Sequence, residues 1–334
     1  MANQRPNDEF ISLLRRSGDT DVNIATAAQR EFAKALELPL RKGVLMGNIL
    51  GNIFETINVE AGSTTEFPLD LISPGLEGEH VAYTNPGHGR IPERSVEGDF
   101  VMIPTYSVTS SIDYLLRYAR EARWDIVSRA MQVMEAGFVK KLNDDGWHTI
   151  LAAGVDRNVL VFDGDATAGM FSKRLVSLMQ TVMRRNSGGN SASVGRGRLT
   201  DMYVSPEALE DVRNWGLDQI DEVTRREIYT ASDGGAPITR IFGVNLHDLD
   251  ELGNGQEYQD FFAVDLSGAL ASGDQELVIG LDQSSSDSFV MPVKQTLQVF
   301  EDPTMHRQQR AGFYGWAELG FGVLDNRRVI LGSF

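Results

Sequence analysis

The chain of 334 residues contains no cysteine and no long run of apolar residues. The absence of cysteine excludes disulfide bonds, thiolate metal sites and thiol catalysis, and it fits assembly in a reducing cytoplasm. No apolar run approaches the roughly 18 residues that a membrane-spanning helix needs. The first ten residues lack the basic-then-apolar pattern of a signal peptide. We therefore expect neither membrane insertion nor export.

Basic residues are also in short supply, with 31 lysines and arginines against 47 aspartates and glutamates, for a formal net charge of -16. This charge repels polyanions, so tight wrapping of nucleic acid is excluded as a main function, whereas enclosing nucleic acid is not. The hydrophobic content of 42% suffices for a buried core. The length predicts about two domains.

One amphipathic segment, residues 122–154, predicts a helix far longer than the ~11-residue average of globular proteins. Its apolar side chains recur at spacings of three and four and so share one helix face: Trp124, Val127, Met131, Met134, Phe138 and Leu142. Unbroken, the helix would be about 45 Å long. Glycine weakens a helix, so we expect a bend near Gly146.

The segments before this helix predict an arm and a long β-excursion. Residues 21–38 predict a helix that is capped at Asp21 and stopped by Pro39, and residues 1–45 lack a core of their own. Between residues 64 and 113, two strand patterns flank a proline- and glycine-rich stretch that exceeds ordinary loop lengths. We expect a projecting hairpin that contacts a neighbouring molecule; the alternative is a mobile surface loop.

The segments after the long helix alternate between strand and helix patterns and then become β-rich. Ser172 and Ser205 are the expected N-caps of two helices, and residues 156–287 predict an α/β domain. Residues 288–334 predict a meander of three strands. The predicted class is α+β, with the α/β domain inserted into a domain built from residues 111–155 and 288–334.

No set of side chains makes a strong catalytic or metal site. Asp144, Asp145 and His148 share a helix face and suit an acid–base pair or part of a metal site, but an exposed helix end of mixed charge explains them better. His80 and His88 lie in the β-excursion without a metal-ligand spacing. We assign no catalytic, cofactor-binding or metal-binding residue.

Two acidic loops resemble calcium-binding loops only in part. In the segment that starts at His247, with Asp248 as position one, Leu252 replaces the fifth-position oxygen ligand and Gln259 replaces the glutamate at position twelve. The segment that starts at Phe162, with Asp163 as position one, fails because Ala168 occupies the sixth position, which needs glycine. Neither loop predicts a calcium site.

A basic cluster flanks a loop rich in glycine and serine: Arg184, Arg185, Arg196 and Arg198. It lacks the interleaved aromatic residues of a single-strand nucleic-acid site. An electrostatic contact to another subunit is therefore the favoured interpretation, and a nucleic-acid patch is the alternative.

The order of these segments resembles that of the major capsid protein of tailed bacteriophages, with its Hong Kong 97-type capsid fold. Two stretches are similar to family text: LTDMYVSPEALEDV, a strand followed by Ser-Pro and a helix, and ITRIFGVNL, which we interpret as one strand. The resemblance implies an N-terminal arm, an extended β-hairpin loop with flanking strands, a peripheral domain with the long spine helix, and an inserted α/β axial domain. The arm would be residues 1–45, and the extended loop with its flanking strands residues 46–110. The peripheral domain would be residues 111–155 with 288–334, and the axial domain residues 156–287.

The resemblance further implies a structural subunit and no enzyme. It would assemble with copies of itself into the hexamers and pentamers of an icosahedral shell that encloses double-stranded DNA, in a virion assembled in the bacterial host cytoplasm. Implied partners are a portal protein and a scaffolding protein, which is expected to be separate because no long coiled-coil extension is present. No membrane or cofactor is implied.

Some members of this family cross-link their subunits through a lysine on the extended loop. The six lysines here all lie outside that loop: Lys34, Lys42, Lys140, Lys141, Lys173 and Lys294. We therefore expect no isopeptide cross-link, and stability from non-covalent interlocking or a decoration protein. Two other functions stay open, namely an encapsulin-like nanocompartment shell and a two-domain metal-dependent hydrolase that uses Asp144 and His148.

Overall fold

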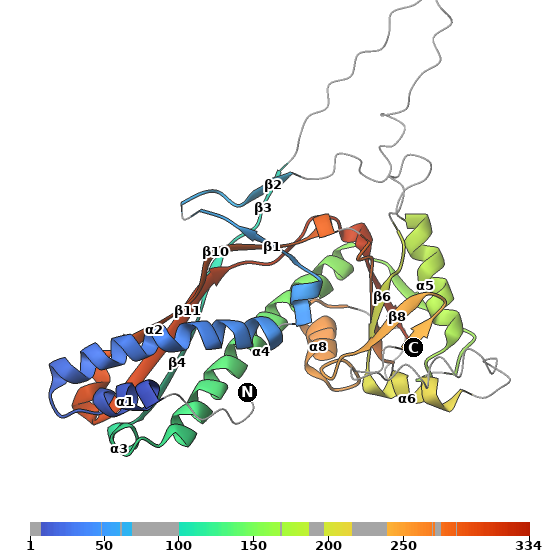
Figure 1. Ribbon diagram of the computed structural model, residues 1–334. Helices are drawn as coiled ribbons and strands as arrows, with labels where there is room; N and C mark the ends of the chain where they lie inside the picture. Colours follow the sequence, from blue (N-terminus) through green and yellow to red (C-terminus); the bar gives the residue numbers. More distant parts are fainter. Residues whose placement is uncertain are drawn as a thin grey trace, which may run out of the picture. The chain divides into compact units, whose positions relative to one another are not determined.

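The computed structural model describes the residues drawn in colour in Figure 1: 8–47, 49–60, 62–68, 100–167, 169–186, 197–215, 239–268, 270, 275–284 and 286–334. The chain divides into two compact units. The first consists of Met1–Thr65, Met102–Gly146 and Val290–Gly322. The second consists of Glu66–Val101, Trp147–Phe289 and Val323–Phe334.

The predicted long helix is confirmed as α4 (Trp124–Asp156), which has 33 residues. Its predicted apolar face is buried, with Val127 at 0% and Phe138 at 2% exposure. The helix continues without a break through Gly146. A Cβ atom at this position would overlap the side chain of Leu50, so Gly146 is needed for close packing within the first unit.

Three more helices belong to the first unit: α1 (Asp8–Ser17), α2 (Val22–Gly47) and α3 (Leu116–Arg120). The expected cap of α2 is confirmed, because the Asp21 carboxylate accepts a hydrogen bond from the Asn23 amide at 2.9 Å.

The expectation that Pro39 ends α2 is wrong, since the helix continues to Gly47. Proline inside a helix removes one hydrogen bond and costs about 3 kcal/mol. The buried face of α2 continues past the proline, where Leu40 and Val44 are 4% and 8% exposed. Burial of these side chains on the first unit offsets the cost of the proline.

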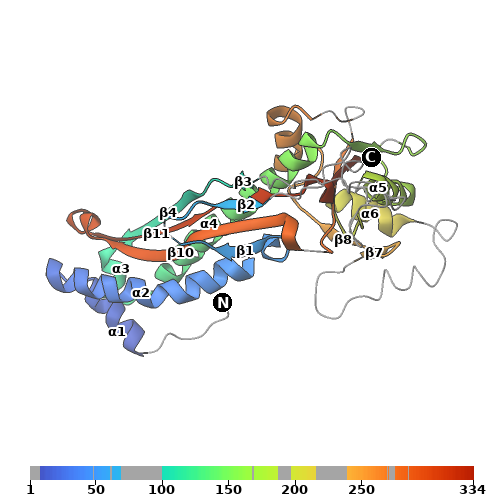
Figure 2. The same ribbon diagram turned by 90° about the horizontal axis from the view of Figure 1, so that it is seen from above.

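A five-stranded sheet forms the centre of the first unit, in the order β1-β10-β11-β4 with β12 paired to β10. Its strands are β1 (Glu55–Asn58), β4 (Tyr106–Leu115), β10 (Phe289–Asp302), β11 (Arg310–Leu319) and β12 (Gly322–Val323). Figure 2 shows β10, β11 and β4 side by side along α2. Phe32 of α2 contacts Phe313 of β11 at 5.7 Å between ring centroids. Phe138 of α4 packs against β11 at Gly315, where the absence of a side chain leaves space for its ring.

The second unit contains a six-stranded mixed sheet in the order β5-β13-β9-β6-β8-β7. Its strands are β5 (Leu160–Phe162), β6 (Asp201–Val204), β7 (Thr239–Ile241), β8 (Val244–Asp248), β9 (Leu277–Leu281) and β13 (Val329–Ser333). Its helices include α5 (Lys173–Asn186), α6 (Pro206–Asn214) and α8 (Glu257–Asp260). Met202 of β6 joins the core beneath α5 and α6. Tyr203, on the other face of β6, packs against Trp147.

Two strand predictions were wrong. The last strand, β13, does not complete a meander with β11 but lies inside the six-stranded sheet, between β5 and β9. Both faces of β13 are buried, with Ile330 at 0% and Leu331 at 2% exposure. Such a strand needs cover on both sides. The stretch ITRIFGVNL forms two strands, β7 and β8, because the chain reverses at Phe242 and Gly243.

Both predicted serine caps are confirmed. The Leu175 amide donates to Ser172 Oγ at 3.1 Å, and the Ala208 amide donates to Ser205 Oγ at 3.2 Å. Ser205 Oγ in turn donates to the Glu276 carboxylate. Burial raises the pKa of Glu276, and the hydrogen bond from Ser205 partly offsets this rise.

Replacement of Ser205 by alanine is expected to lower the free energy of unfolding by about 1–3 kcal/mol, because it removes a helix cap and a hydrogen bond to a carboxylate. The raised pKa means that ionised Glu276 costs stability, and the variant adds to this cost because the carboxylate loses the hydrogen bond from Ser205. The cost disappears as the pH falls through the folded-state pKa of Glu276. The loss should therefore be smaller at pH 4 than at pH 7 in urea denaturation. Ser12→Ala, which changes an exposed serine, is the control and should stay within about 0.5 kcal/mol of the wild type. A loss that is equal at both pH values would contradict the role of Glu276.

Candidate functional site

In the Asp144–His148 corner of α4, the side chains of Asp145 and His148 make structural contacts, and Asp144 is half-buried. Asp145 accepts hydrogen bonds from Lys141 Nζ and from the Tyr106 hydroxyl, both at 2.7 Å. Burial and the Asp145 carboxylate raise the pKa of Tyr106, so its hydroxyl stays protonated and donates. The His148 ring stacks on Phe261 at 3.8 Å between centroids. The structure thus gives Asp145 and His148 separate partners and does not join them into an acid–base pair.

The acidic loop after β5 supports the start of α5. Asp163, which is 3% exposed, accepts hydrogen bonds from Ser172 Oγ at 2.7 Å and from the Asp165 amide at 3.2 Å. Arg174 forms ion pairs with both carboxylates. Through these contacts, the loop after β5 orders the N-terminus of α5.

The other acidic loop also has structural contacts. His247 Nε2 lies 2.8 Å from Asp201 Oδ1, and its ring stacks on Tyr203 at 4.9 Å. Burial alone would raise the pKa of Asp201. Hydrogen bonds with neighbours such as His247 outweigh burial, so the pKa of Asp201 is lowered overall. Within the described ranges, no group of three or more acidic or histidine side chains is placed to hold a metal ion.

The basic cluster and the remaining histidine candidates are only partly described. Arg184 and Arg185 lie exposed in the last turn of α5, and the backbone amide of Arg198 donates to Asp282 at 3.1 Å. Arg196 lies outside the described residues. His80 and His88, in the predicted extended loop, do so as well.

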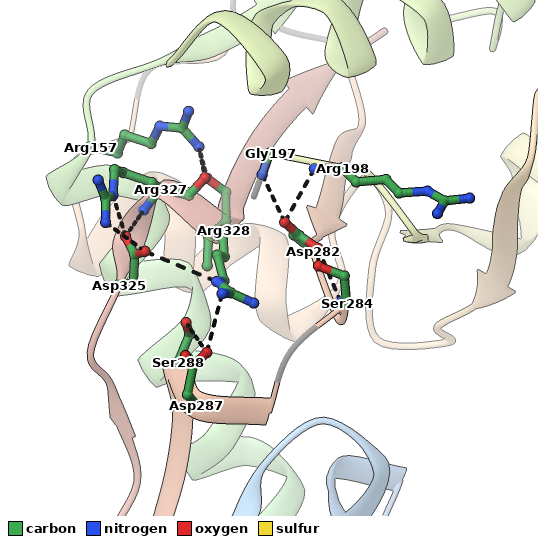
Figure 3. A network of polar contacts seen from close by, with 11 residues as sticks. Arg157, Gly197, Arg198, Asp282, Ser284, Asp287, Ser288, Asp325, Arg327 and Arg328 are labelled. Carbon is green, nitrogen blue, oxygen red and sulfur yellow. Dashed lines mark hydrogen bonds and ion pairs between the residues drawn. The ribbon is translucent and has the colours of Figure 1, made fainter. Parts of the chain in front are cut away.

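A polar network in the second unit, missed by the sequence interpretation, is drawn in Figure 3. Arg328 is a buried cation, 3% exposed, and its guanidinium lies 3.1 Å from the Asp287 carboxylate and 4.0 Å from that of Asp325. Asp325 also accepts three hydrogen bonds from Arg327, at 2.7 to 3.1 Å. A buried charge needs such partners. The network therefore fixes the turn that leads into β13.

Two further contacts tie this network to neighbouring loops (Figure 3). Arg157, at the end of α4, donates to the backbone carbonyls of Arg327 and Val329, while burial lowers its pKa. The fully buried Asp282 accepts hydrogen bonds from the amides of Gly197 at 2.9 Å and Arg198 at 3.1 Å. Since these groups mainly hold backbone, the network is structural. Its sequence signal is the run of charges from Asp325 to Arg328.

Exposed apolar side chains mark a different kind of surface on the ribbon formed by β2 (Glu66–Pro68) and β3 (Phe100–Met102). Phe100, Val101 and Met102 are 60%, 37% and 66% exposed. A two-stranded ribbon is marginally stable alone, and contiguous exposed apolar residues mark interaction sites. The ribbon is therefore a candidate contact surface.

A second candidate contact surface is the edge strand β4. It pairs with β11 over ten residues, from Tyr106 to Leu115. In the part of the chain that the structure describes, no strand pairs with its other edge. An open edge offers backbone donors and acceptors to another chain.

The described part of the chain contains no helix with both the length and the apolar composition to cross a membrane. At the sequence level, no protein-family model matches the chain, and no similar protein is found among curated sequences.

Solved structures, in contrast, share its fold. A structure from Microbacterium phage Oxtober96 is 12% identical, with a TM-score of 0.57 over 86% of this chain and 90% of that one. The capsid of cyanophage P-SCSP1u is 12% identical, with a TM-score of 0.56 over 85% and 87%. The capsid asymmetric unit of cyanophage Pam1 is 14% identical, with a TM-score of 0.54 over 84% and 88%.

These likenesses extend over most of each chain and confirm the α+β class predicted from the sequence. They also confirm the resemblance that the order of segments had indicated. The chain therefore has the Hong Kong 97-type fold of phage major capsid proteins.

Proposed function

We propose that this chain is the major capsid protein of a tailed bacteriophage, a structural subunit that assembles with copies of itself into an icosahedral shell around double-stranded DNA. The observation that carries the proposal is the fold shared with phage capsids over 84–86% of the chain. The exposed ribbon and the open edge of β4 support it, because a shell subunit needs surfaces that meet different surfaces on its neighbours.

In this proposal each segment has a mechanical role. Residues 1–45 are the arm, and residues 46–110 form the extended loop that reaches a neighbour from the β2–β3 ribbon. The α4 helix is the spine of a peripheral domain made from residues 111–155 and 288–334, and residues 156–287 form the axial domain. Overlaps of arm and loop add buried apolar area at ~25 cal/mol per Å², although ordering costs cancel part of this gain.

We also propose how the subunit relates to the DNA, to partner proteins and to the host cell. The net charge of -16 suits an inner wall along which packaged DNA moves without sticking. A portal protein, a scaffolding protein and a decoration protein are proposed partners. We propose that the subunit assembles in the bacterial host cytoplasm and is then part of the virion.

Expression of the full chain should give particles of hundreds of subunits, measured by light scattering and electron microscopy. Denaturing gels of these particles should show only the monomer band, because no lysine lies in the extended loop. A chain that stayed monomeric at high concentration and bound a metal ion would contradict the proposal in favour of a hydrolase. Tail-less shells filled with enzyme would favour a nanocompartment.

A further inference from the structure

The turn between β7 and β8 is built on a residue that does not suit it. Phe242 has φ 51° and Gly243 has φ 82°, so both central residues of this two-residue turn are left-handed. Asparagine or glycine is usual at the first position, and positive φ in a bulky residue is an outlier. The other non-glycine residues with positive φ in the described part of the chain are small or polar: Ala122, Asn158, Ser267 and Gln309. Such strain is a pointer to function.

The Phe242 ring is also turned away from the core. It is 61% exposed, whereas its strand neighbours Ile241 and Val244 are 5% and 0% exposed. Gln180 of α5 donates to the Phe242 carbonyl at 3.2 Å and fixes the turn. The turn thus presents a pre-ordered aromatic side chain to solvent. Aromatic residues held in this way are typical anchors of protein interfaces.

A second exposed apolar group lies at the opposite corner of the same sheet. Phe162 of β5 is 40% exposed, and Met170 in the following loop is 51% exposed. The strands β5 and β7 form the two edges of the sheet. Strands β5, β13, β6 and β8 all run in one direction, and Phe162 is at their C-terminal end. The turn at Phe242 is at their N-terminal end, so the two apolar groups occupy diagonal corners.

The charges at the two corners are complementary. Arg240 is exposed two residues before Phe242. Near Phe162, Arg174 pairs with the carboxylates of Asp163 and Asp165, and the Asp165 side chain is still 74% exposed, so this corner offers an exposed carboxylate. Copies of a chain with a net charge of -16 repel one another. The exposed Arg240 of one copy against the exposed Asp165 of the next reduces this repulsion and orients the partners.

We propose that Phe242 of one copy packs against Phe162 and Met170 of the next copy. The two surfaces differ, so the contact is head-to-tail and repeats until a ring closes. This inference rests on the proposed shell function and adds the residues that make one contact between copies.

The first test replaces Phe242 by asparagine in the full chain. Asn-Gly suits the turn better than Phe-Gly, so thermal unfolding of the unassembled subunit should occur at the same or a higher temperature. The concentration at which particles form should rise about tenfold or more, because an aromatic anchor is lost. Val264→Asn, which changes a residue of the same unit that is 75% exposed, is the control and should leave this concentration unchanged.

The second test uses the absence of cysteine from the chain. The double variant Phe242→Cys with Met170→Cys should form a ladder of disulfide-linked copies in oxidised particles, while each single variant should not. Particles without the ladder, or particles of Phe242→Asn at the wild-type concentration, would overturn the contact. A wild-type chain that forms no particles would instead contradict the proposed shell function.

Discussion

Replacement of Trp147 by alanine is expected to lower the free energy of unfolding of the second unit by about 3–5 kcal/mol. Trp147 is 0% exposed and is one of the largest fully buried side chains in the described chain. The rings of Trp147 and Tyr203 form a T-shaped contact with their centroids 4.7 Å apart, and the Tyr258 ring centroid lies 6.3 Å from that of Trp147. Alanine would leave a cavity between α4, β6 and α8. Hydrogen exchange of the amides in β6 and α8 should become faster, and urea denaturation should give the size of the loss.

The matched control is Trp147→Phe. The indole nitrogen of Trp147 is buried and has no hydrogen-bond partner among the described residues, an arrangement that costs about 1–3 kcal/mol. Phenylalanine fills most of the space and removes this unpaired donor, so the expected loss is below about 1.5 kcal/mol. If both variants lost the same stability, the ring packing of Trp147 would not be what holds this part of the unit together.

Local features of the fold were predictable because their signals lie within a few residues. The apolar spacing in α4 is one such signal, and the serine caps at Ser172 and Ser205 are another. A cap needs only an oxygen and the next turn of backbone, so its geometry follows from neighbouring residues. The resemblance of the segment order then led to the capsid fold.

Features that depend on distant parts of the chain were not predictable. The apolar run of β13 fits many sheets, and only its pairing with β5 and β9 shows which one it joins. In the sequence, Gly146 looks like a position that weakens the helix, whereas its role is set by contact with Leu50, which is far away in the chain. The turn at Phe242 was missed because Phe-Gly is a poor turn signal.

The candidate chemistry shows the same limit. Asp145 and His148 are close in sequence, but Tyr106 of β4 binds one, and Phe261 of the π-helix Phe261–Asp265 stacks on the other. The network around Arg328 could not be assembled from the sequence, because Arg157, Asp287 and Asp325 come from separate segments. Sequence spacing alone therefore suggested a site where the fold makes structural contacts.

Replacement of Phe32 by alanine is expected to destabilise the unassembled first unit by about 3–5 kcal/mol. The sequence predicts that residues 1–45 lack a core of their own, and in the structure Phe32 of α2 is buried by side chains from other elements of the first unit. Phe32 is 0% exposed, and its ring lies 4.9 Å from that of Phe10, 6.5 Å from that of Trp124 and 5.7 Å from that of Phe313. This cluster joins α1 and α2 to α4 and β11 of the same chain. Its loss should release both helices.

The release of α1 and α2 can be measured on monomeric subunits by limited trypsin digestion, with cleavage after Arg15 and Arg30 expected to become faster. Glu31→Ala, at the neighbouring exposed position, is the control and should leave the digestion unchanged. If Phe32→Ala left the monomer as stable as the wild type and weakened only assembled particles, the arm would depend on a neighbouring copy for its burial. The contacts of Phe32 with Trp124 and Phe313 argue for burial within one subunit, so α1 and α2 should be folded in the free subunit.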